Sequence, residues 1–310
     1  MKEEFHFPSR DRHTTIRAVR YLPDDGVVRA VLQITHGMQE YIDRYDDFAD
    51  YLTNNNIAVY GMDLLGHGQS VRSEHDWGFM AEPRPADTII SDMHTLYEII
   101  KEDIPGEPVF MLGHSMGSFL LRKYIMTFGK EINGAIIMGT GFTPKRTSKM
   151  GLGIVNLLAR FKGWRKPSRL VEKMMFGRAY KKFSMDGSRP EDSWLTRDTD
   201  IVRKYYADPR CTFKFKLNGY KGLIETVLQT CSQTYINKTP DQLPVLLISG
   251  EDDPVGDRGH GVKIVHNMLN DAGIRDLTCI MYRDHRHEIL NEIGREHVYK
   301  DILKWIVDRI

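Results

Sequence analysis

The strongest constraint on the fold is an alternation of short apolar runs and amphipathic runs, which occupies both ends of the chain. Runs rich in β-branched and apolar residues are typical of strands, and runs with apolar residues three or four positions apart are typical of helices. The predicted strands cover residues 13–22, 29–35, 57–62, 108–112, 135–138, 245–249 and 277–282. The predicted helices cover residues 43–54, 87–102, 115–128, 261–270 and 288–310. This alternation predicts an α/β fold with a mostly parallel central sheet and helices on both faces.

Residues 143–222 interrupt the alternation and differ from the rest of the chain in charge. They hold 20 Lys and Arg against 7 Asp and Glu, a net charge of +13, whereas the other residues carry a net charge of −12. The reactive site of an open parallel sheet lies beyond the carboxyl ends of its strands. We therefore expect residues 1–142 and 223–310 to form the core and residues 143–222 to form a basic, mainly helical cap (lid) insertion over the site.

The composition excludes several classes of protein. Of the 310 residues, 41% are hydrophobic and 27% are charged, which argues against collagen-like, coiled-coil and intrinsically disordered chains. No run approaches the roughly 18–20 apolar residues that a membrane-spanning helix needs, and the charged start MKEEFHFPSR does not look like a signal peptide. Cys211, Cys231 and Cys279 are odd in number and widely spaced, so we expect no disulfide framework and a cytoplasmic location.

The sequence Gly113-His114-Ser115-Met116-Gly117 fits the pattern G-x-S-x-G between a predicted strand and a predicted helix. In that setting the pattern is typical of a nucleophile elbow, a tight turn that projects the serine hydroxyl at the positive end of a helix. The glycines permit the turn because strand and helix approach closely there. We expect Ser115 to be a nucleophile; an idle serine in a Gly-rich turn is the alternative.

A serine hydroxyl needs a base that removes its proton and a carboxylate that orients the base. In this kind of fold the acid and then the histidine follow the serine along the chain, on loops after late strands. One such loop offers Glu251, Asp252 and Asp253, and the next offers His285 and His287. We assign Asp253 as the acid and His287 as the base, because His287 directly precedes the last predicted helix. A solvated acidic turn and a surface histidine are the alternatives.

The negative charge of a tetrahedral intermediate needs two donors aimed at its oxygen. One is expected to be the backbone N–H of Met116, the residue after the nucleophile. The loop after strand 29–35 should supply the other, and we assign the backbone N–H of Met38 because Gly37 lets that loop turn inward. An ordinary His-Gly turn is the alternative.

The sequence does not indicate a metal or a nucleotide cofactor. His285 and His287 lie two residues apart, with no HExxH motif and no third ligand at helical spacing. Gly151-Leu152-Gly153 lacks the third glycine and the preceding strand of a dinucleotide-binding loop, and no GxxxxGK[ST] motif occurs. The basic segment carries no nucleic-acid-binding motif. We therefore expect no cofactor, no metal and no nucleic-acid partner.

Five short motifs in a fixed order resemble one known family. HGMQEYIDRYDDFADYL, DLLGHGQS, GHSMGS, GEDDPVG and RHEILNE are similar to the monoacylglycerol lipase and lysophospholipase branch of the α/β-hydrolases, which is often grouped with the serine aminopeptidases. The resemblance covers residues 25–142 and 240–310 and does not extend to the middle segment. It implies an α/β-hydrolase fold.

The resemblance also implies roles for individual residues. Ser115 takes the position of the nucleophile, Asp253 that of the acid and His287 that of the base, and the oxyanion donors fall on Met38 and Met116. These assignments agree with those made from the residues alone. The chain departs from the family at two nearby positions, because the family commonly has His where Tyr41 stands and a small residue where Gln39 stands.

Residues 150–161 of the middle segment carry a helical stripe of apolar side chains with basic residues on both sides. A basic amphipathic helix is typical of peripheral contact with an anionic membrane surface, and a cap helix packed on the core is the alternative. The stripe consists of Met150, Ile154, Leu157, Leu158 and Phe161, and its basic neighbours are Lys145, Arg146, Lys149, Arg160, Lys162, Arg165, Lys166 and Arg169.

Together these patterns predict a serine hydrolase that cleaves carboxylic esters through a catalytic triad and an acyl-enzyme. The expected substrate is a small-molecule ester of a lipid-like acyl chain, such as a monoacylglycerol or a lysophospholipid. A serine aminopeptidase is one alternative, but it would need an acidic pocket for the substrate ammonium, which the basic cap does not favour. A non-catalytic hydrolase-like binding protein is the other alternative.

Overall fold

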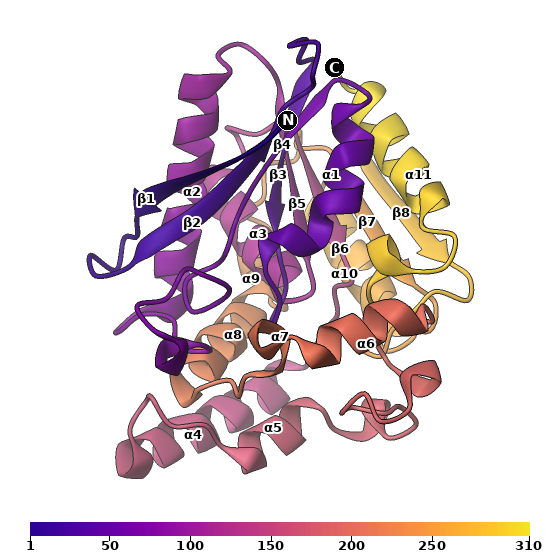
Figure 1. Ribbon diagram of the computed structural model, residues 1–310. Helices are drawn as coiled ribbons and strands as arrows, with labels where there is room; N and C mark the ends of the chain where they lie inside the picture. Colours follow the sequence, from indigo (N-terminus) through magenta and orange to yellow (C-terminus); the bar gives the residue numbers. More distant parts are fainter.

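In the computed structural model, which describes residues 1–310 except for the side chain of Arg178, eight strands form one sheet (Figure 1). The strands are β1 (Lys2–Pro8), β2 (Thr15–Tyr21), β3 (Ala30–Thr35), β4 (Ile57–Met62), β5 (Val109–His114), β6 (Gly134–Met138), β7 (Val245–Gly250) and β8 (Leu277–Tyr282). Their order across the sheet is β1-β2-β4-β3-β5-β6-β7-β8, and neighbours from β4 to β8 run parallel. The prediction of a mostly parallel sheet is confirmed.

The edge strand β1 is missing from the sequence prediction. It pairs antiparallel with β2, from Lys2 opposite Tyr21 to Pro8 opposite Thr15. Most of its side chains are exposed or half-buried, so it lacks the apolar run that marks β3 to β7, in which every residue is buried. An antiparallel edge strand needs only one covered face, and the apolar signal is correspondingly weak.

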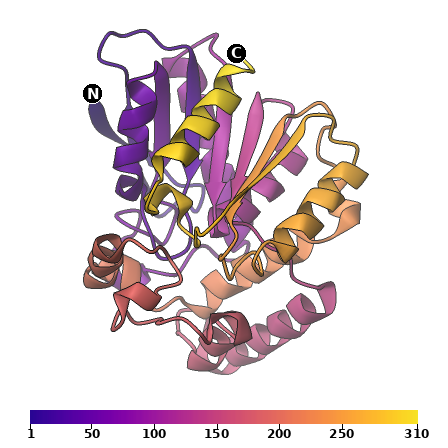
Figure 2. The same cartoon turned by 90° about the vertical axis from the view of Figure 1, so that its right-hand side faces the viewer.

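Helices cover both faces of the sheet, as predicted (Figures 1 and 2). On one face, α1 (Asp46–Thr53) and α11 (Glu296–Val307) pack against the sheet in one apolar core that includes Phe48 and Trp305. The helices of the other face contribute to a second core that includes Leu96 and Leu121. They are α2 (Pro85–Asp103), α3 (Met116–Phe128) and α10 (His260–Asp271).

The prediction of one helix over residues 288–310 is wrong. A short 3-10 helix, η5 (Ile289–Asn291), comes first, and α11 begins only at Glu296. The carboxylate of Glu292 is fully buried and accepts backbone N–H groups of Arg286 and Ile293, and Gly294 adopts a left-handed φ of 85°. These bonds satisfy backbone groups outside a helix, and a left-handed residue ends regular α-helical geometry.

Between β6 and β7 the chain forms helices that lie beyond the carboxyl ends of the parallel strands (Figures 1 and 2). They are α4 (Lys145–Lys162), α5 (Arg169–Met175), α6 (Thr199–Ala207), α7 (Pro209–Thr212) and α8 (Leu217–Thr230), with short 3-10 helices between α5 and α6. The last helix before β7, α9 (Gln233–Ile236), instead packs against α3 and α10 beside the sheet. Helix α8 packs against both α4 and α3 and runs across position 222, so the division into a core and a cap of residues 143–222 stays a proposal. No helix in the described residues is both long and apolar enough to cross a membrane.

Two glycines allow α3 to start directly against the sheet. A Cβ on Gly117 would lie 2.1 Å from the Thr35 carbonyl oxygen and 2.6 Å from that of His36, and a Cβ on Gly113 would lie 2.4 Å from the carbonyl oxygen of Gly117. Each of these neighbours is backbone, which cannot move aside cheaply. The close approach of strand and helix therefore requires glycine here.

We expect Gly117→Ala to lower the free energy of unfolding by about 3 kcal/mol, because overpacking against backbone forces the helix away from the sheet. Urea unfolding followed by circular dichroism measures the change. Gly153→Ala is the matched control: Gly153 lies within α4 with open space around it, so the alanine should raise stability by about 0.5–1 kcal/mol. Equal stability of the two variants would contradict the expectation.

Candidate active site

Ser115 stands at the turn between β5 and α3 in a backbone conformation that side chains rarely adopt. Its φ is 52° and its ψ is −118°, and its N–H donates to the carbonyl of Met138 at the end of β6 over 3.0 Å. A residue held outside the favoured regions is strained by about 1–3 kcal/mol, and such strain gathers at functional sites. The residue is half-buried, between the end of the sheet and the start of the helix.

His287 and Asp253 form a buried pair. The Nδ1 atom of His287 lies 2.9 Å from Oδ2 of Asp253, and the two residues are 1% and 0% exposed. The other carboxylate oxygen accepts the N–H of Val255 at 2.8 Å. Since an ionised carboxylate only accepts hydrogen bonds, the proton of the neutral imidazole sits on Nδ1. The Nε2 atom is then the basic nitrogen, and it has no hydrogen-bond partner in the described residues.

The imidazole of His287 lies beside the strand ends that carry the elbow. A Cβ on Gly139, the residue after Met138, would be 3.1 Å from its Cε1 atom. Its ring centroid is 4.7 Å from that of His114, the residue before Ser115. No hydrogen bond joins Ser115 to Nε2 of His287 in the described part of the chain. Such bonds are often long before substrate binds and tighten in the reacting complex.

The rival residues on the two loops lie elsewhere. Nδ1 of His285 is 2.9 Å from the carbonyl oxygen of Arg283, and its ring packs on Tyr282. Asp252 lies 3.9 Å from Lys182, and Glu251 is exposed. The structure therefore brings Asp253, rather than the other two acids of its loop, to the imidazole.

The backbone N–H groups of Met38 and Met116 flank the elbow. Met116 is the first residue of α3, so its N–H has no acceptor within the helix. Neither N–H donates to another backbone group among the described residues. The loop that carries Met38 lies against the serine, because a Cβ on Gly37 would be 2.9 Å from Cβ of Ser115. Both predicted oxyanion donors therefore lie on segments that contact Ser115.

A buried carboxylate that the sequence analysis missed supports this loop. Oε1 of Glu40 accepts the backbone N–H of Gly37 and lies 2.8 Å from Nδ1 of His114. The neighbouring imidazole holds the pKa of Glu40 well below its usual range despite burial, and the carboxylate raises the pKa of His114, although burial alone would lower it. The signal in the sequence was an acid three residues after Gly37, the residue that precedes a predicted oxyanion donor.

An arginine extends this network to the histidine loop. Arg44 is half-buried, and it donates to Glu40 at 3.1 Å and to both carboxylate oxygens of Glu288 at 2.8 and 2.6 Å. Glu288 follows His287 in the chain. A bidentate guanidinium–carboxylate pair fixes direction as well as distance. One side chain therefore joins residues 36–41, which carry the predicted donor Met38 and are called the oxyanion loop below, to residues 283–288, which carry His287 and are called the histidine loop.

The segment around Trp194 covers His287. The indole of Trp194 stacks on the imidazole with ring centroids 4.9 Å apart and an angle of 28°. The carbonyls of Trp194 and Leu195 accept the N–H groups of His287 and Glu288 at 3.4 and 2.7 Å. This contact explains the burial of the imidazole and could not be read from the sequence, because it joins residues about 90 positions apart.

A cavity of about 720 Å³ opens beside Trp194 and Gln39, between the middle segment and the oxyanion loop. Its apolar lining is mostly aromatic, and its charged lining holds three basic and two acidic residues. The aromatic residues are Phe176, Trp194, Tyr205, Tyr206 and Phe213, and the charged ones are Arg169, Lys173, Lys214, Glu172 and Asp186. Small-molecule sites are usually concave and lined mainly by apolar and aromatic side chains, and the aromatic part of this lining fits that pattern.

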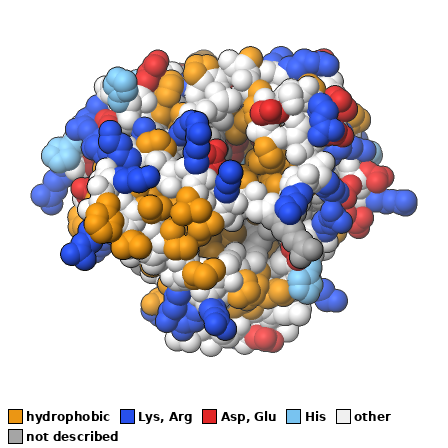
Figure 3. All heavy atoms as spheres, turned by 90° about the horizontal axis from the view of Figure 1, so that it is seen from below, with side chains coloured by type: hydrophobic (Ala, Val, Ile, Leu, Met, Phe, Trp, Pro, Cys, Tyr) orange, Lys and Arg blue, Asp and Glu red, His pale blue; other side chains and the backbone are white. Residues whose placement is uncertain are grey.

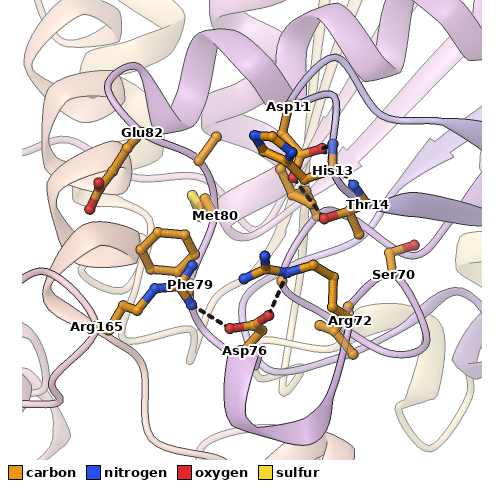
Figure 4. Close-up of a pocket in the computed structure, with 14 residues that line it drawn as sticks. Asp11, His13, Thr14, Ser70, Arg72, Asp76, Phe79, Met80, Glu82 and Arg165 are labelled. Carbon is orange, nitrogen blue, oxygen red and sulfur yellow. Dashed lines mark hydrogen bonds and ion pairs between the residues drawn. The ribbon is translucent and has the colours of Figure 1, made fainter.

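A second, smaller cavity of about 330 Å³ is polar and has a different lining (Figure 4). Arg72 and Arg165 both pair with the carboxylate of Asp76, and the Arg165 guanidinium lies 3.8 Å from the ring centroid of Phe79. Its two arginines are thus already paired. Among the described residues, no group of three or more His, Cys, Asp and Glu side chains is arranged to hold a metal ion.

A parallel sheet, a strained serine at a strand-to-helix turn and a buried imidazole–carboxylate pair on later loops define the α/β-hydrolase class. The family described as serine aminopeptidase, S33, matches residues 26–294, and the chain belongs to this family.

Relatives of this chain span nearly its whole length. It is 24% identical over 286 residues to a monoacylglycerol lipase of Mycolicibacterium smegmatis, covering 91% of this chain and 89% of that protein. It is 25% identical over 305 residues to the monoglyceride lipase of Mus musculus, covering 94% and 86%. The structure of a thermostable carboxyl esterase from Bacillus coagulans superposes with a TM-score of 0.90 at 27% identity, covering 99% of this chain and 98% of that one. The prediction of a carboxylic ester hydrolase is confirmed.

The Glu40–His114 pair should make stability depend on pH. The raised pKa of His114 means that its contribution is fully present below its ordinary value of about 6.5 and is lost as pH rises through the higher folded value. In Glu40→Gln the buried imidazole loses its anion, so its protonation should oppose folding instead. We expect the stability deficit of Glu40→Gln to grow by more than about 1 kcal/mol between pH 9 and pH 6.

Urea unfolding at several pH values measures this deficit. Glu98→Gln is the control. Glu98 is an exposed residue of α2, and its ion pairs are long, 3.5 Å to Arg10 and 3.9 Å to His94. A deficit for Glu40→Gln that stays constant from pH 6 to pH 9 would contradict the assigned coupling.

Proposed function

We propose that this chain hydrolyses carboxylic esters of lipid-like acyl chains, such as monoacylglycerols or lysophospholipids, with Ser115 as nucleophile, His287 as base and Asp253 as orienting acid. The observation that carries the proposal is the buried Nδ1–Oδ2 contact of 2.9 Å, which leaves Nε2 of His287 without a partner next to the elbow. The names of the lipase relatives support the same substrate class.

In the proposed reaction, Nε2 of His287 takes the proton of the Ser115 hydroxyl as the oxygen attacks the ester carbonyl. Asp253 holds the imidazole in the required tautomer and stabilises its cation. The N–H groups of Met38 and Met116 hold the oxyanion of the tetrahedral intermediate. The imidazolium then protonates the departing alcohol, and a water molecule, activated by the same imidazole, releases the acid from the acyl-enzyme.

The 720 Å³ cavity supports an acyl substrate over a peptide. Its aromatic walls suit apolar chains, since burying apolar surface contributes about 0.8 kcal/mol per methylene group. An aminopeptidase would need an acidic pocket for the substrate ammonium, whereas in this cavity Arg169, Lys173 and Lys214 outnumber Glu172 and Asp186. The buried imidazole–carboxylate pair also argues against a binding protein without catalysis.

The outer face of α4 and α5 is proposed to rest on an anionic membrane surface. Met150, Leu157, Phe161 and Leu170 are exposed, with Phe161 80% exposed. The view from below, onto the side where α4 and α5 lie, shows Lys and Arg side chains among apolar ones (Figure 3). A helix that presents apolar side chains among basic ones is suited to the lipid interface. Leu158, another member of the predicted stripe, packs against the core instead.

Ser115→Ala is expected to lower kcat on p-nitrophenyl esters by about 10⁴-fold or more, because the variant lacks the nucleophile. His287→Ala should cause a similar loss, and the double variant should be no slower than either single one, since the two residues act as a unit. A fluorophosphonate probe should label the unmodified protein and not Ser115→Ala.

His285→Ala is the matched control, because that histidine lies away from the elbow, and it should retain activity and labelling. Undiminished activity of Ser115→Ala would refute the assigned nucleophile. A panel of esters graded by chain length, run beside aminoacyl p-nitroanilides, separates the two enzyme classes: faster cleavage of the anilides would favour the aminopeptidase.

Phe161→Asp is expected to weaken binding to phosphatidylglycerol vesicles by about tenfold, because it places a charge in the apolar patch and lowers its net positive charge. Vesicle co-sedimentation measures the binding. Val27→Asp is the control, since Val27 is also a solvent-exposed apolar residue, 54% exposed. It precedes the amino end of β3, whereas α4 lies beyond the carboxyl ends of the parallel strands. Equal binding of both variants would refute the proposed surface.

A further inference from the structure

The oxyanion loop and the middle segment are joined by a group of contacts that we call the loop–cap clasp. It consists of Gln39 and Tyr41 on the loop and Asp208, Arg210 and the carbonyl of Phe213 on the middle segment. The Gln39 side-chain amide donates to the Phe213 carbonyl. The Tyr41 hydroxyl donates to Asp208 at 2.7 Å and accepts from Arg210 at 2.8 Å. The clasp therefore grips the loop on both sides of Glu40.

Gln39 has an energetically unfavourable backbone conformation. Its φ is 59°, in the left-handed region, where a residue with a Cβ is disfavoured by roughly 1–2 kcal/mol. Gln39 directly follows Met38, so its φ and ψ set the path of the chain just after the proposed oxyanion donor. Because the loop is strained at this residue, outside contacts must keep it in place.

The contacts of Tyr41 fix the orientation of its ring and hydroxyl as well as its position. The guanidinium of Arg210 stacks 3.9 Å from the ring centroid of Tyr41 and also pairs with Asp208 at 2.8 Å. Asp208 in turn caps α7 by accepting the N–H of Arg210. Burial raises the pKa of Tyr41, so its hydroxyl remains a donor throughout the range in which esters can be assayed. These contacts fix the tyrosine against the start of α7.

We propose that Gln39 and Tyr41 are positioning residues, which aim the N–H of Met38 at the oxyanion while residues 208–213 lie on the loop. The inference rests on the proposed function, because it assigns a cause for the geometry of one oxyanion donor. It makes part of the middle segment a support for catalysis rather than only a wall of the substrate cavity. Glu40 holds the same loop from the core side through Gly37 and Arg44.

The test uses Tyr41→Phe and Gln39→Gly in the full-length protein. Tyr41→Phe removes both hydrogen bonds of the hydroxyl and keeps the ring under Arg210. Gln39→Gly removes the grip on Phe213 while relieving the backbone strain, so the variant should fold at least as well. Because Gln39 also lines the 720 Å³ cavity, the substrate is p-nitrophenyl acetate, whose acyl group is too short to fill that space.

We expect each variant to lower kcat by about tenfold with KM within about twofold, because a misaimed donor weakens only the transition state. Phenylboronic acid forms a tetrahedral adduct with a serine nucleophile and reports the same site without turnover. Its inhibition constant should rise by a similar factor. Tyr235→Phe and Gln242→Glu, at exposed positions outside the clasp, are the matched controls and should leave both constants unchanged.

Three outcomes decide the matter. A parallel loss in kcat and in boronate affinity, with unchanged melting temperature, supports the clasp. Unchanged kcat and boronate affinity in both variants would overturn it, as would a rise in KM alone, which would place the effect in substrate entry. The proposed function is tested separately by Ser115→Ala: if that variant is inactive while the clasp variants are fully active, the triad stands and only the clasp is lost.

Discussion

The rest of the site depends on the hydrogen bonds of one buried carboxylate, that of Glu40. Glu40 is a buried residue of the oxyanion loop itself, and Gly37, His114 and Arg44 are among its hydrogen-bond partners. A buried charge is tolerated only when it is paired and fully hydrogen-bonded. Removing any one partner would leave an expensive anion behind, so the group strongly favours a single arrangement of the elbow, the loop after β3 and the histidine loop.

Much of this arrangement was accessible from the sequence. The strands β3 to β7 are buried on both faces, so each reads as an apolar run, and the glycines of the elbow mark where strand and helix touch. The order of serine, acid and histidine on loops after strands then restricted the candidates. The structure places His287 against Asp253, while the catalytic roles of these two residues and those of Ser115, Met38 and Met116 are proposals.

What the sequence did not reveal depends on contacts between distant segments. Glu40 resembles any polar loop residue until His114 is known to face it, and Trp194 resembles any cap aromatic until it is seen on His287. The end of the chain misled for a similar reason. Residues 288–295 have helical spacing, but the buried carboxylate of Glu292 accepts the backbone N–H groups of Ile293 and Arg286 outside any helix. The spacing of apolar residues indicates which face of a segment is buried. It does not show that a side-chain carboxylate will accept the backbone N–H groups of that segment.

The hydrogen bonds to the backbone carbonyls around Trp194 affect how this protein could be re-engineered. Arg286 donates to the carbonyls of Glu191 and Ser193, and the next two residues donate to Trp194 and Leu195. Residues 191–195 thus support the loop that carries the imidazole of His287 through hydrogen bonds. A chimaera that exchanges the whole insertion would remove these hydrogen bonds together with the walls of the 720 Å³ cavity. A chimaera that exchanges only α4 and α5 would keep residues 191–195, so these outer helices are the better segment to exchange.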